Sequence, residues 1–139
     1  MSDKCFFDTN ILVYMQDSND LRKQEKSRSV FFDCISKDSA FISTQSLQEF
    51  YNVTTKKNKL VSKTAKEIVH WLSISVPVVQ ITPALIEQAI DISIETQFTF
   101  WDSLILSAAV SARCSVLYSE DLNDGQTVRG VTICNPFTV

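Results

Sequence analysis

Hydrophobic positions along the chain alternate between short apolar runs and longer segments with helical spacing. The short runs are rich in aromatic and β-branched residues, which is typical of buried strands; they cover residues 4–7, 40–43, 76–81, 115–118 and 131–134. The longer segments repeat apolar residues every three or four positions, which predicts helices; they cover residues 18–37, 44–57, 62–73, 83–97 and 100–112, and a further helix begins near Asp8. Strands alternating with helices predict an α/β fold whose mainly parallel sheet is covered on both faces.

Two of the predicted helices differ in how their apolar residues are distributed. Segment 100–112 is almost wholly apolar, which predicts a central helix. Segment 83–97 has an acidic row at four-residue spacing, Glu87, Asp91 and Glu95, which is expected to face solvent. Its apolar positions are expected to face the core, and these are Ile86, Ala89, Ile90 and Ile94.

Composition agrees with a globular protein. The 139 residues are 45% hydrophobic and 21% charged, and only 2 Gly and 3 Pro are present, so we expect a single domain over residues 1–139 without a linker. No apolar stretch approaches the roughly 20 residues that span a bilayer. The N-terminus lacks a basic region followed by an apolar one. We therefore expect a cytoplasmic protein that does not contact a membrane.

Several classes of chemistry are disfavoured by residues that the chain lacks. Its 4 cysteines are far apart and show no CxxC spacing, which argues against zinc or redox motifs. The 1 histidine, His70, lies in an apolar helical context, and no GxSxG nucleophile motif accompanies it. The two glycines, Gly125 and Gly130, form no phosphate-binding loop. Any catalysis is expected to depend mainly on carboxylates.

Four acidic residues are candidates for this chemistry: Asp8, Glu49, Asp102 and Asp121. Asp8 directly follows the first predicted strand, and Asp121 follows the strand that ends at residue 118. In open α/β sheets, ligands bind outside the carboxyl ends of the strands, so both acids are expected at the same edge. Asp8, Glu49 and Asp102 also border apolar segments, where an unpaired carboxylate is costly. A divalent cation would offset this cost, and Mg²⁺ is commonly held by one or two carboxylates.

Each acid also has a purely structural interpretation. Asp8, within Asp-Thr-Asn, suits a turn or a helix cap. Ser46 followed by Glu49 fits a capping box, as does the four-residue run that ends at Asp102. Asp121 lies among ordinary turn residues. Taken one at a time, these roles remain open for all four acids.

The joint pattern of these motifs resembles the PIN domain family. The motifs are Phe-Asp-Thr-Asn-Ile-Leu at 7–12, Gln-Glu-Phe at 48–50, Trp-Asp-Ser-Leu-Ile at 101–105, and Ser-Glu-Asp-Leu at 119–122 followed by Gly125. Among PIN proteins the chain is most similar to the small VapC-type toxins of toxin–antitoxin operons. The resemblance implies an α/β/α sandwich and an endoribonuclease that depends on Mg²⁺ or Mn²⁺. It also implies a homodimer and a cognate VapB-like antitoxin.

The resemblance assigns expected roles residue by residue. Asp8 matches the first acid of the family and Asp102 the third, and both are expected to bind the metal. Glu49 matches the second acid and Asp121 the fourth, and these two are expected to complete the site. Ser119 stands where the family has Ser or Thr, and Glu120 and Asp124 remain alternatives to Asp121. Thr9 and Asn10 are expected to hydrogen-bond behind the ligands. Water activated by the metal would then attack an RNA phosphodiester in line, leaving a 5′-phosphate and a 3′-hydroxyl.

A run of lysines offers a candidate surface for RNA. In a chain of net charge −3, five lysines occur between residues 56 and 66 without an intervening acid. Lys56, Lys57 and Lys63 are candidates for phosphate binding, although a solvated helix connection explains the same run. Two other functions remain open: a non-catalytic PIN-like scaffold that binds RNA or protein, and a metal-assisted phosphatase. The phosphatase usually carries a DxD pair, and here position 10 is Asn.

Overall fold

The computed structural model describes residues 3–138 and places six strands in one sheet, in the order β3-β2-β1-β4-β6-β5. The strands are β1 (Cys5–Phe7), β2 (Ala40–Ser43), β3 (Val78–Val79), β4 (Val116–Tyr118), β5 (Thr127–Val128) and β6 (Val131–Cys134). Neighbouring strands pair in parallel except β5 and β6, which are antiparallel. The mainly parallel sheet is thus confirmed. Residues 1, 2 and 139 of the predicted domain lie outside the described residues.

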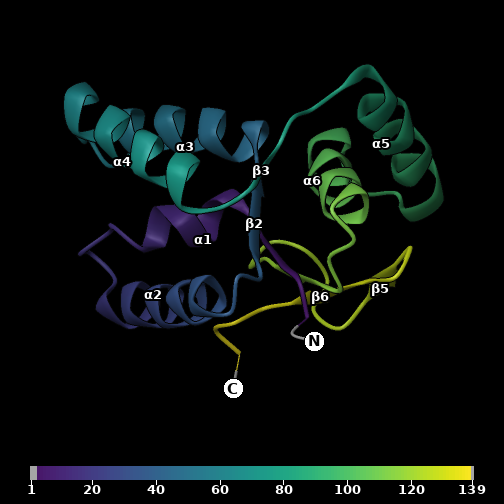
Figure 1. Cartoon of the computed structure of the whole chain (residues 1–139), viewed down its shortest axis with the longest axis horizontal. Helices are drawn as coiled ribbons and strands as arrows, with labels where there is room; N and C mark the ends of the chain where they lie inside the picture. Colours follow the sequence, from purple (N-terminus) through teal and green to yellow (C-terminus); the bar gives the residue numbers. More distant parts are fainter. Residues whose placement is uncertain (1–2, 139) are drawn as a thin grey trace.

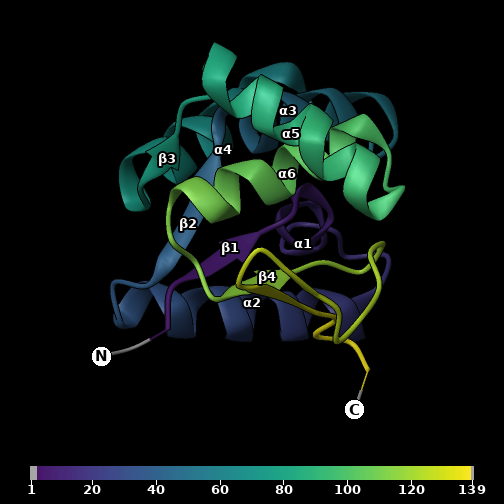
Figure 2. The ribbon, with the colours of Figure 1, turned by 90° about the vertical axis from the view of Figure 1, so that its right-hand side faces the viewer.

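Helices cover both faces of this sheet, as predicted (Figure 1). They are α1 (Thr9–Tyr14), α2 (Leu21–Ser36), α3 (Thr44–Lys56), α4 (Ser62–Ser75), α5 (Pro83–Thr96) and α6 (Phe100–Ser111). Figure 2 looks onto the face that α5 and α6 cover. The alternation of β1 explains the two layers: Phe7 points into a core with Phe31 of α2 and Phe50 of α3, whereas Phe6 packs with Ile105 of α6.

The apolar face predicted for α5 is wrong in part. Ala89 is buried as expected, but Ile86, Ile90 and Ile94 are exposed, and Ile92 is buried instead. α5 rests on α6, and the small Ala89 together with Ile92 faces that helix, so the stripe of larger isoleucines turns toward solvent. The central position of α6 is confirmed, since its residues from Ser103 to Ala109 are all buried.

Strand lengths are the other difference from the sequence prediction. β3 covers only Val78–Val79 rather than residues 76–81, because Val76 still caps α4. β5 was not predicted; its two residues pair with β6 across a short turn. Across residues 3–138, no helix combines the length and the apolar character needed to cross a membrane.

Candidate active site at the carboxyl edge of the sheet

A cleft of about 370 Å³ opens beyond the carboxyl ends of β1 and β4. Its walls come from α1, α3, α6 and the segment after β4. All four candidate acids line it, together with residues that the sequence did not single out; the acids are Asp8, Glu49, Asp102 and Asp121. The fold therefore brings together carboxylates from four separate elements.

Asp8 is the most deeply buried of these acids. It caps α1, where its Oδ1 accepts the backbone N–H of Thr9 at 2.7 Å, and its Oδ2 accepts the hydroxyl of Ser119 at 2.8 Å. The pKa of Asp8 is raised from 3.8 to about 6, mainly by burial. The two hydrogen bonds lower this pKa, and the nearby charges of Asp102 and Asp121 raise it further. The capping interpretation and a functional role are thus compatible for this residue.

Glu49 projects from α3 toward α1. Its Oε1 accepts the hydroxyl of Thr9 at 3.0 Å, and burial, assisted by the charge of Asp102, raises its pKa. The capping-box interpretation of Glu49 is wrong, because α3 begins one residue after Ser43 and the box is formed by Ser43 and Ser46. The Glu49 carboxylate therefore does not cap α3, and the residue lines the cleft.

Asp102 and Asp121 enter the cleft from different elements, α6 and the segment after β4. Asp102 lies in the first turn of α6, where its backbone N–H donates to the Thr99 hydroxyl at 3.1 Å. The helix dipole favours a carboxylate at that end. Asp121 accepts the side-chain amide of Asn10 at 2.9 Å, and its backbone N–H donates to Ser119 at 3.2 Å. The Ser119 hydroxyl therefore connects Asp121 with Asp8.

The two alternatives to Asp121 have other partners. Glu120 accepts the Tyr14 hydroxyl at 2.7 Å and forms an ion pair with Lys23. Asp124 accepts the backbone N–H of Asn135 at 2.9 Å, which holds the C-terminal turn. Neither residue lines the cleft. Among these three neighbouring acids, Asp121 is the one that the fold directs into it.

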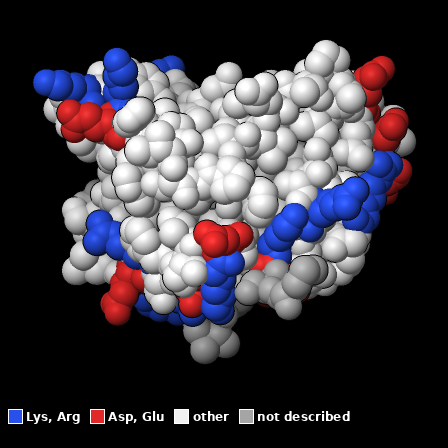
Figure 3. Space-filling model, viewed as in Figure 1, with Lys and Arg blue, Asp and Glu red and all other residues white. Residues whose placement is uncertain are grey.

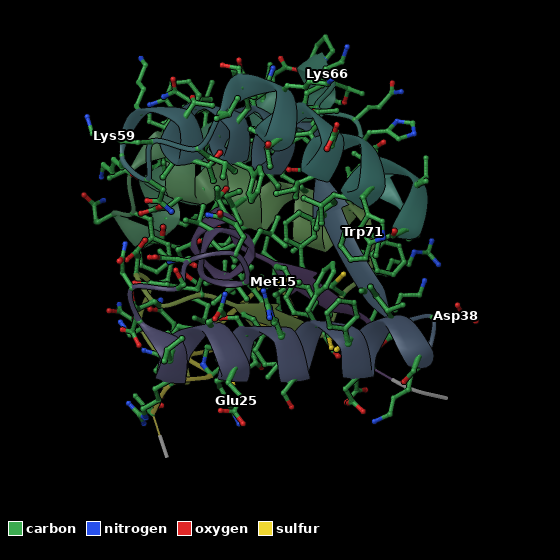
Figure 4. The ribbon with its side chains drawn as sticks, turned by 90° about the vertical axis from the view of Figure 1, so that its left-hand side faces the viewer. Met15, Glu25, Asp38, Lys59, Lys66 and Trp71 are labelled. Carbon is green, nitrogen blue, oxygen red and sulfur yellow. The ribbon has the colours of Figure 1, made fainter. Side chains whose placement is uncertain are left out.

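The candidate lysines separate into two locations. Lys57 lines the cleft, whereas Lys63 lines a shallow depression over α4 with Lys66, and Lys56 lines neither. Figure 3 shows basic side chains at the α3–α4 end of the molecule and also along its lower and right-hand sides, and Figure 4 places Lys59 and Lys66 at the α3–α4 end. Only one of the three predicted lysines thus faces the acids.

Among the cleft residues to which the sequence analysis assigned no role are Gln45, Asn58 and Trp101. The side-chain Oε1 of Gln45 and Nδ2 of Asn58 are buried without a hydrogen-bond partner in the described structure, as is Oδ1 of Asn10. Such atoms are costly unless a ligand satisfies them. The polar run around residues 44–46 and the exposed aromatic beside Asp102 carried the only sequence signals for these positions.

The donor set suits a hydrated cation rather than a fully enclosed one. Within residues 3–138, no three His, Cys, Asp or Glu side chains are close enough to surround an ion by themselves. Mg²⁺ keeps several waters and uses one or two carboxylates, so it does not need such a cluster. Carboxylate oxygens and the unpartnered Oδ1 of Asn10 are oxygen donors of the kind that Mg²⁺ and Mn²⁺ prefer. The residues present therefore fit a partly hydrated divalent ion.

Comparison with known proteins identifies the family. A sequence model of the PIN domain matches residues 5–123, and the chain therefore belongs to the PIN domain family. A search of curated proteins gives no match.

Solved structures with the same fold include toxins and toxin–antitoxin complexes. VapC20 of Mycobacterium tuberculosis, a sarcin-ricin loop cleaving toxin, has a TM-score of 0.67 and 18% identity over 85% of this chain and 90% of that chain. A toxin–antitoxin complex from Klebsiella pneumoniae has a TM-score of 0.72 and 16% identity over 98% of this chain and 100% of that chain. DNA-bound VapBC from Salmonella typhimurium has a TM-score of 0.70 and 19% identity over 95% of this chain and 97% of that chain. At these identities the likeness concerns the fold.

Proposed function

We propose that this chain is an endoribonuclease that requires Mg²⁺ or Mn²⁺, and that it is the toxin of a toxin–antitoxin pair. The observation that carries the proposal is the convergence of Asp8, Glu49, Asp102 and Asp121 on one cleft at the carboxyl edge of the sheet. Membership of the PIN family and the toxin folds of the structural neighbours support it.

The chain's own residues divide the work in this proposal. Asp8 and Asp102 hold the ion, and Glu49 and Asp121 complete its surroundings or orient water. When bound, the metal supplies an acidified water molecule and stabilises negative charge on the phosphate. Thr9, Asn10 and Ser119 fix the carboxylates through the hydrogen bonds described above. No histidine lines the cleft, so proton transfer at this site would fall to carboxylates, to water, or to the Tyr14 and Lys57 side chains that also line it.

Cleavage of RNA by the purified protein tests the proposal. Total small RNA is incubated with Mg²⁺ or Mn²⁺, with EDTA, and with the variants Asp8→Asn and Asp102→Asn. Asp91→Asn serves as a matched control, because Asp91 is an exposed acid of α5 outside the cleft. We expect cleavage to require metal and to be lost in both cleft variants but not in Asp91→Asn. Equal cleavage by all four proteins, or cleavage in EDTA, would overturn it.

Metal binding separates the nuclease from the scaffold, and phosphate release separates it from the metal-assisted phosphatase. A scaffold that only binds RNA or protein has no need for an ion, so calorimetric titration with Mn²⁺ should show no binding that depends on Asp8. A phosphatase would instead release phosphate from a simple aryl phosphate. We expect Mn²⁺ binding that is lost in Asp8→Asn and no release of phosphate from the aryl ester.

An antitoxin partner and a homodimer complete the proposal. The Klebsiella structure is a toxin–antitoxin complex and the Salmonella structure is VapBC, which supports a partner of this kind for the present chain in the cytoplasm. Co-expression with a VapB-like antitoxin encoded beside the gene is expected to abolish toxicity and ribonuclease activity. Light scattering on the purified chain measures whether it forms a dimer. Unrelieved toxicity in the presence of that neighbour would argue against the toxin–antitoxin assignment.

A further inference from the structure

A large aromatic side chain stands exposed at the acidic cleft. Trp101 is 63% exposed although it directly precedes Asp102 in the first turn of α6, and it lines the cleft. Its ring is held by an edge contact with Phe100, at 5.1 Å between centroids and an interplanar angle of 73°. In an edge contact only one ring presents its face to the other, so with 63% of Trp101 exposed at least one face of the indole is available for another flat group.

Two amide side chains line the same cleft, that of buried Gln45 and that of half-buried Asn58. Gln45 is 4% exposed, and its Nε2 donates to the backbone carbonyl of Trp101 at 3.1 Å, which ties the start of α3 to the start of α6. This bond leaves its Oε1 buried without a partner, and Nδ2 of Asn58 is in the same condition. The cleft therefore offers an acceptor, a donor and an aromatic face. Lys57, adjacent to Asn58, adds a cation.

We propose that Trp101, Gln45 and Asn58 form a subsite for one unpaired nucleobase beside the carboxylates. This inference rests on the proposed ribonuclease function and names the substrate class for it. Single-stranded RNA is recognised by stacking of splayed bases on aromatic side chains and by hydrogen bonds to base edges. Here the base stacks on Trp101, the two amides bind its edge, and Lys57 attracts a neighbouring phosphate.

The subsite predicts a preference for unpaired RNA. A base inside a duplex cannot stack on a protein aromatic ring unless it leaves its own stack, so loops and single strands should bind better than a helix of the same length. A contact between two copies of the chain is the competing explanation for the exposed ring, because Ile90 and Ile94 of α5 are also exposed. The experiment below gives different results in that case.

The chain's 2 tryptophans allow a direct optical test. Trp71 belongs to α4 and lies in a separate groove near Phe32 of α2, at 5.8 Å between ring centroids, outside the acidic cleft (Figure 4). The variant Trp71→Phe keeps only the cleft reporter, and Trp101→Phe keeps only the control reporter. Each is titrated with a short single-stranded oligonucleotide in EDTA, so that no cleavage occurs. An abasic oligonucleotide of equal length and a duplex are the comparison ligands.

We expect saturable quenching of Trp101 by the single strand in Trp71→Phe, weaker quenching by the abasic strand and the duplex, and none in Trp101→Phe. Quenching that follows protein concentration without RNA would instead identify a contact between copies. Equal quenching by the abasic and the normal strand would also overturn the base subsite.

Affinity gives the second readout. Loss of a stacked base typically weakens binding about 5- to 150-fold, so Trp101→Ala should raise the dissociation constant by a factor in that range, and Trp101→Phe by less. Gln45→Ala should weaken binding of the normal strand more than that of the abasic strand. Trp71→Ala is the matched control and should leave the affinity unchanged. Unchanged affinity in Trp101→Ala, with unfolding temperature also unchanged, would refute the subsite.

These outcomes separate the subsite from the proposed function. Binding is measured without metal, so a protein that quenches and binds as expected but never cleaves RNA would retain the subsite and lose the ribonuclease. A protein that cleaves RNA equally well with Trp101→Ala, at substrate concentrations below KM, would retain the ribonuclease and lose the subsite.

Discussion

Replacing Asp8 by asparagine is expected to stabilise the metal-free protein while abolishing metal binding. Asp8 is only 8% exposed, and its carboxylate accepts hydrogen bonds from two neutral donors, the Thr9 N–H and the Ser119 hydroxyl. Asparagine has the same shape and is an equally good helix cap. Its Oδ1 can accept from Thr9, and its amide can donate to the Ser119 oxygen. The substitution therefore removes a buried charge and keeps both partners of the side chain, with the Ser119 hydroxyl turned from donor to acceptor toward residue 8.

The magnitude follows from the pKa of Asp8. Because this pKa rises from 3.8 to about 6 on folding, the folded protein retains a proton that the unfolded chain releases between these values. Stability consequently falls as the pH rises through this window and levels off above about 6. Each pH unit is worth about 1.4 kcal/mol, so the ionised carboxylate costs the fold about 3 kcal/mol at neutral pH. Below about pH 4 the cost disappears.

Urea unfolding in EDTA at pH 4 and pH 7.5 measures this effect. The wild type should lose about 2 kcal/mol between the two values through Asp8 alone, and Asp8→Asn should lack that part of the decrease. Added Mg²⁺ should stabilise the wild type at pH 7.5, by about 2.7 kcal/mol at a hundred times its dissociation constant, and leave the variant unchanged. Asp91→Asn controls for a general change of charge. A variant no more stable than the wild type at pH 7.5 in EDTA would refute the reasoning.

Three further predictions concern other parts of the molecule. Phe50→Ala removes a fully buried ring from the core that Phe50 shares with Phe7 and Phe31. Urea unfolding should show that the unfolding free energy is lower by about 3–5 kcal/mol. Lys57→Ala should weaken RNA binding and reduce the slope of the logarithm of the binding constant against the logarithm of the salt concentration by about 0.7. Lys63→Ala should change neither the affinity nor the slope in the same filter-binding assay. Glu120→Gln should leave RNA cleavage intact while Asp121→Asn diminishes it; the reverse result would exchange their roles.

The order of helices and strands was predictable from the sequence because it depends on local periodicity. The run 4–7 and the segment 44–57 both match observed elements closely. The errors arise where packing overrides the local pattern. The face of α5 is decided by α6, against which the small Ala89 fits better than Ile90, and no count of apolar positions within α5 reveals this. A two-residue strand such as β5 is too short to carry a period.

The sequence could predict those site residues that directly follow a strand, because the ends of the strands can be located from the sequence. Asp8 and Asp121 follow neighbouring parallel strands, so their meeting at one edge follows from the topology. The meeting of Glu49 with Thr9 depends on how α3 packs over α1, which only the tertiary structure shows. Gln45 escaped notice for a similar reason: an amide near a helix start suggests nothing until its partner, the carbonyl of Trp101, is known.

The partners of the acids distinguish the cleft from the rest of the surface. The ion pairs of residues 3–138 join Glu120 with Lys23, Asp33 with Lys37 and Glu95 with Arg129, and none includes an acid of the cleft. Within the cleft, the carboxylates of Asp8, Glu49 and Asp121 accept hydrogen bonds from hydroxyl, amide and backbone N–H groups, which fix their positions without cancelling their charge. Neighbouring Glu120 and Asp121 show the contrast within one turn, since the first has its own lysine and the second only Asn10. The charges of Asp102 and Asp121 add to the burial that raises the pKa of Asp8, and that of Asp102 acts on Glu49 in the same way. Carboxylates held together like this favour an external cation, which is the condition that a metal-dependent hydrolase needs.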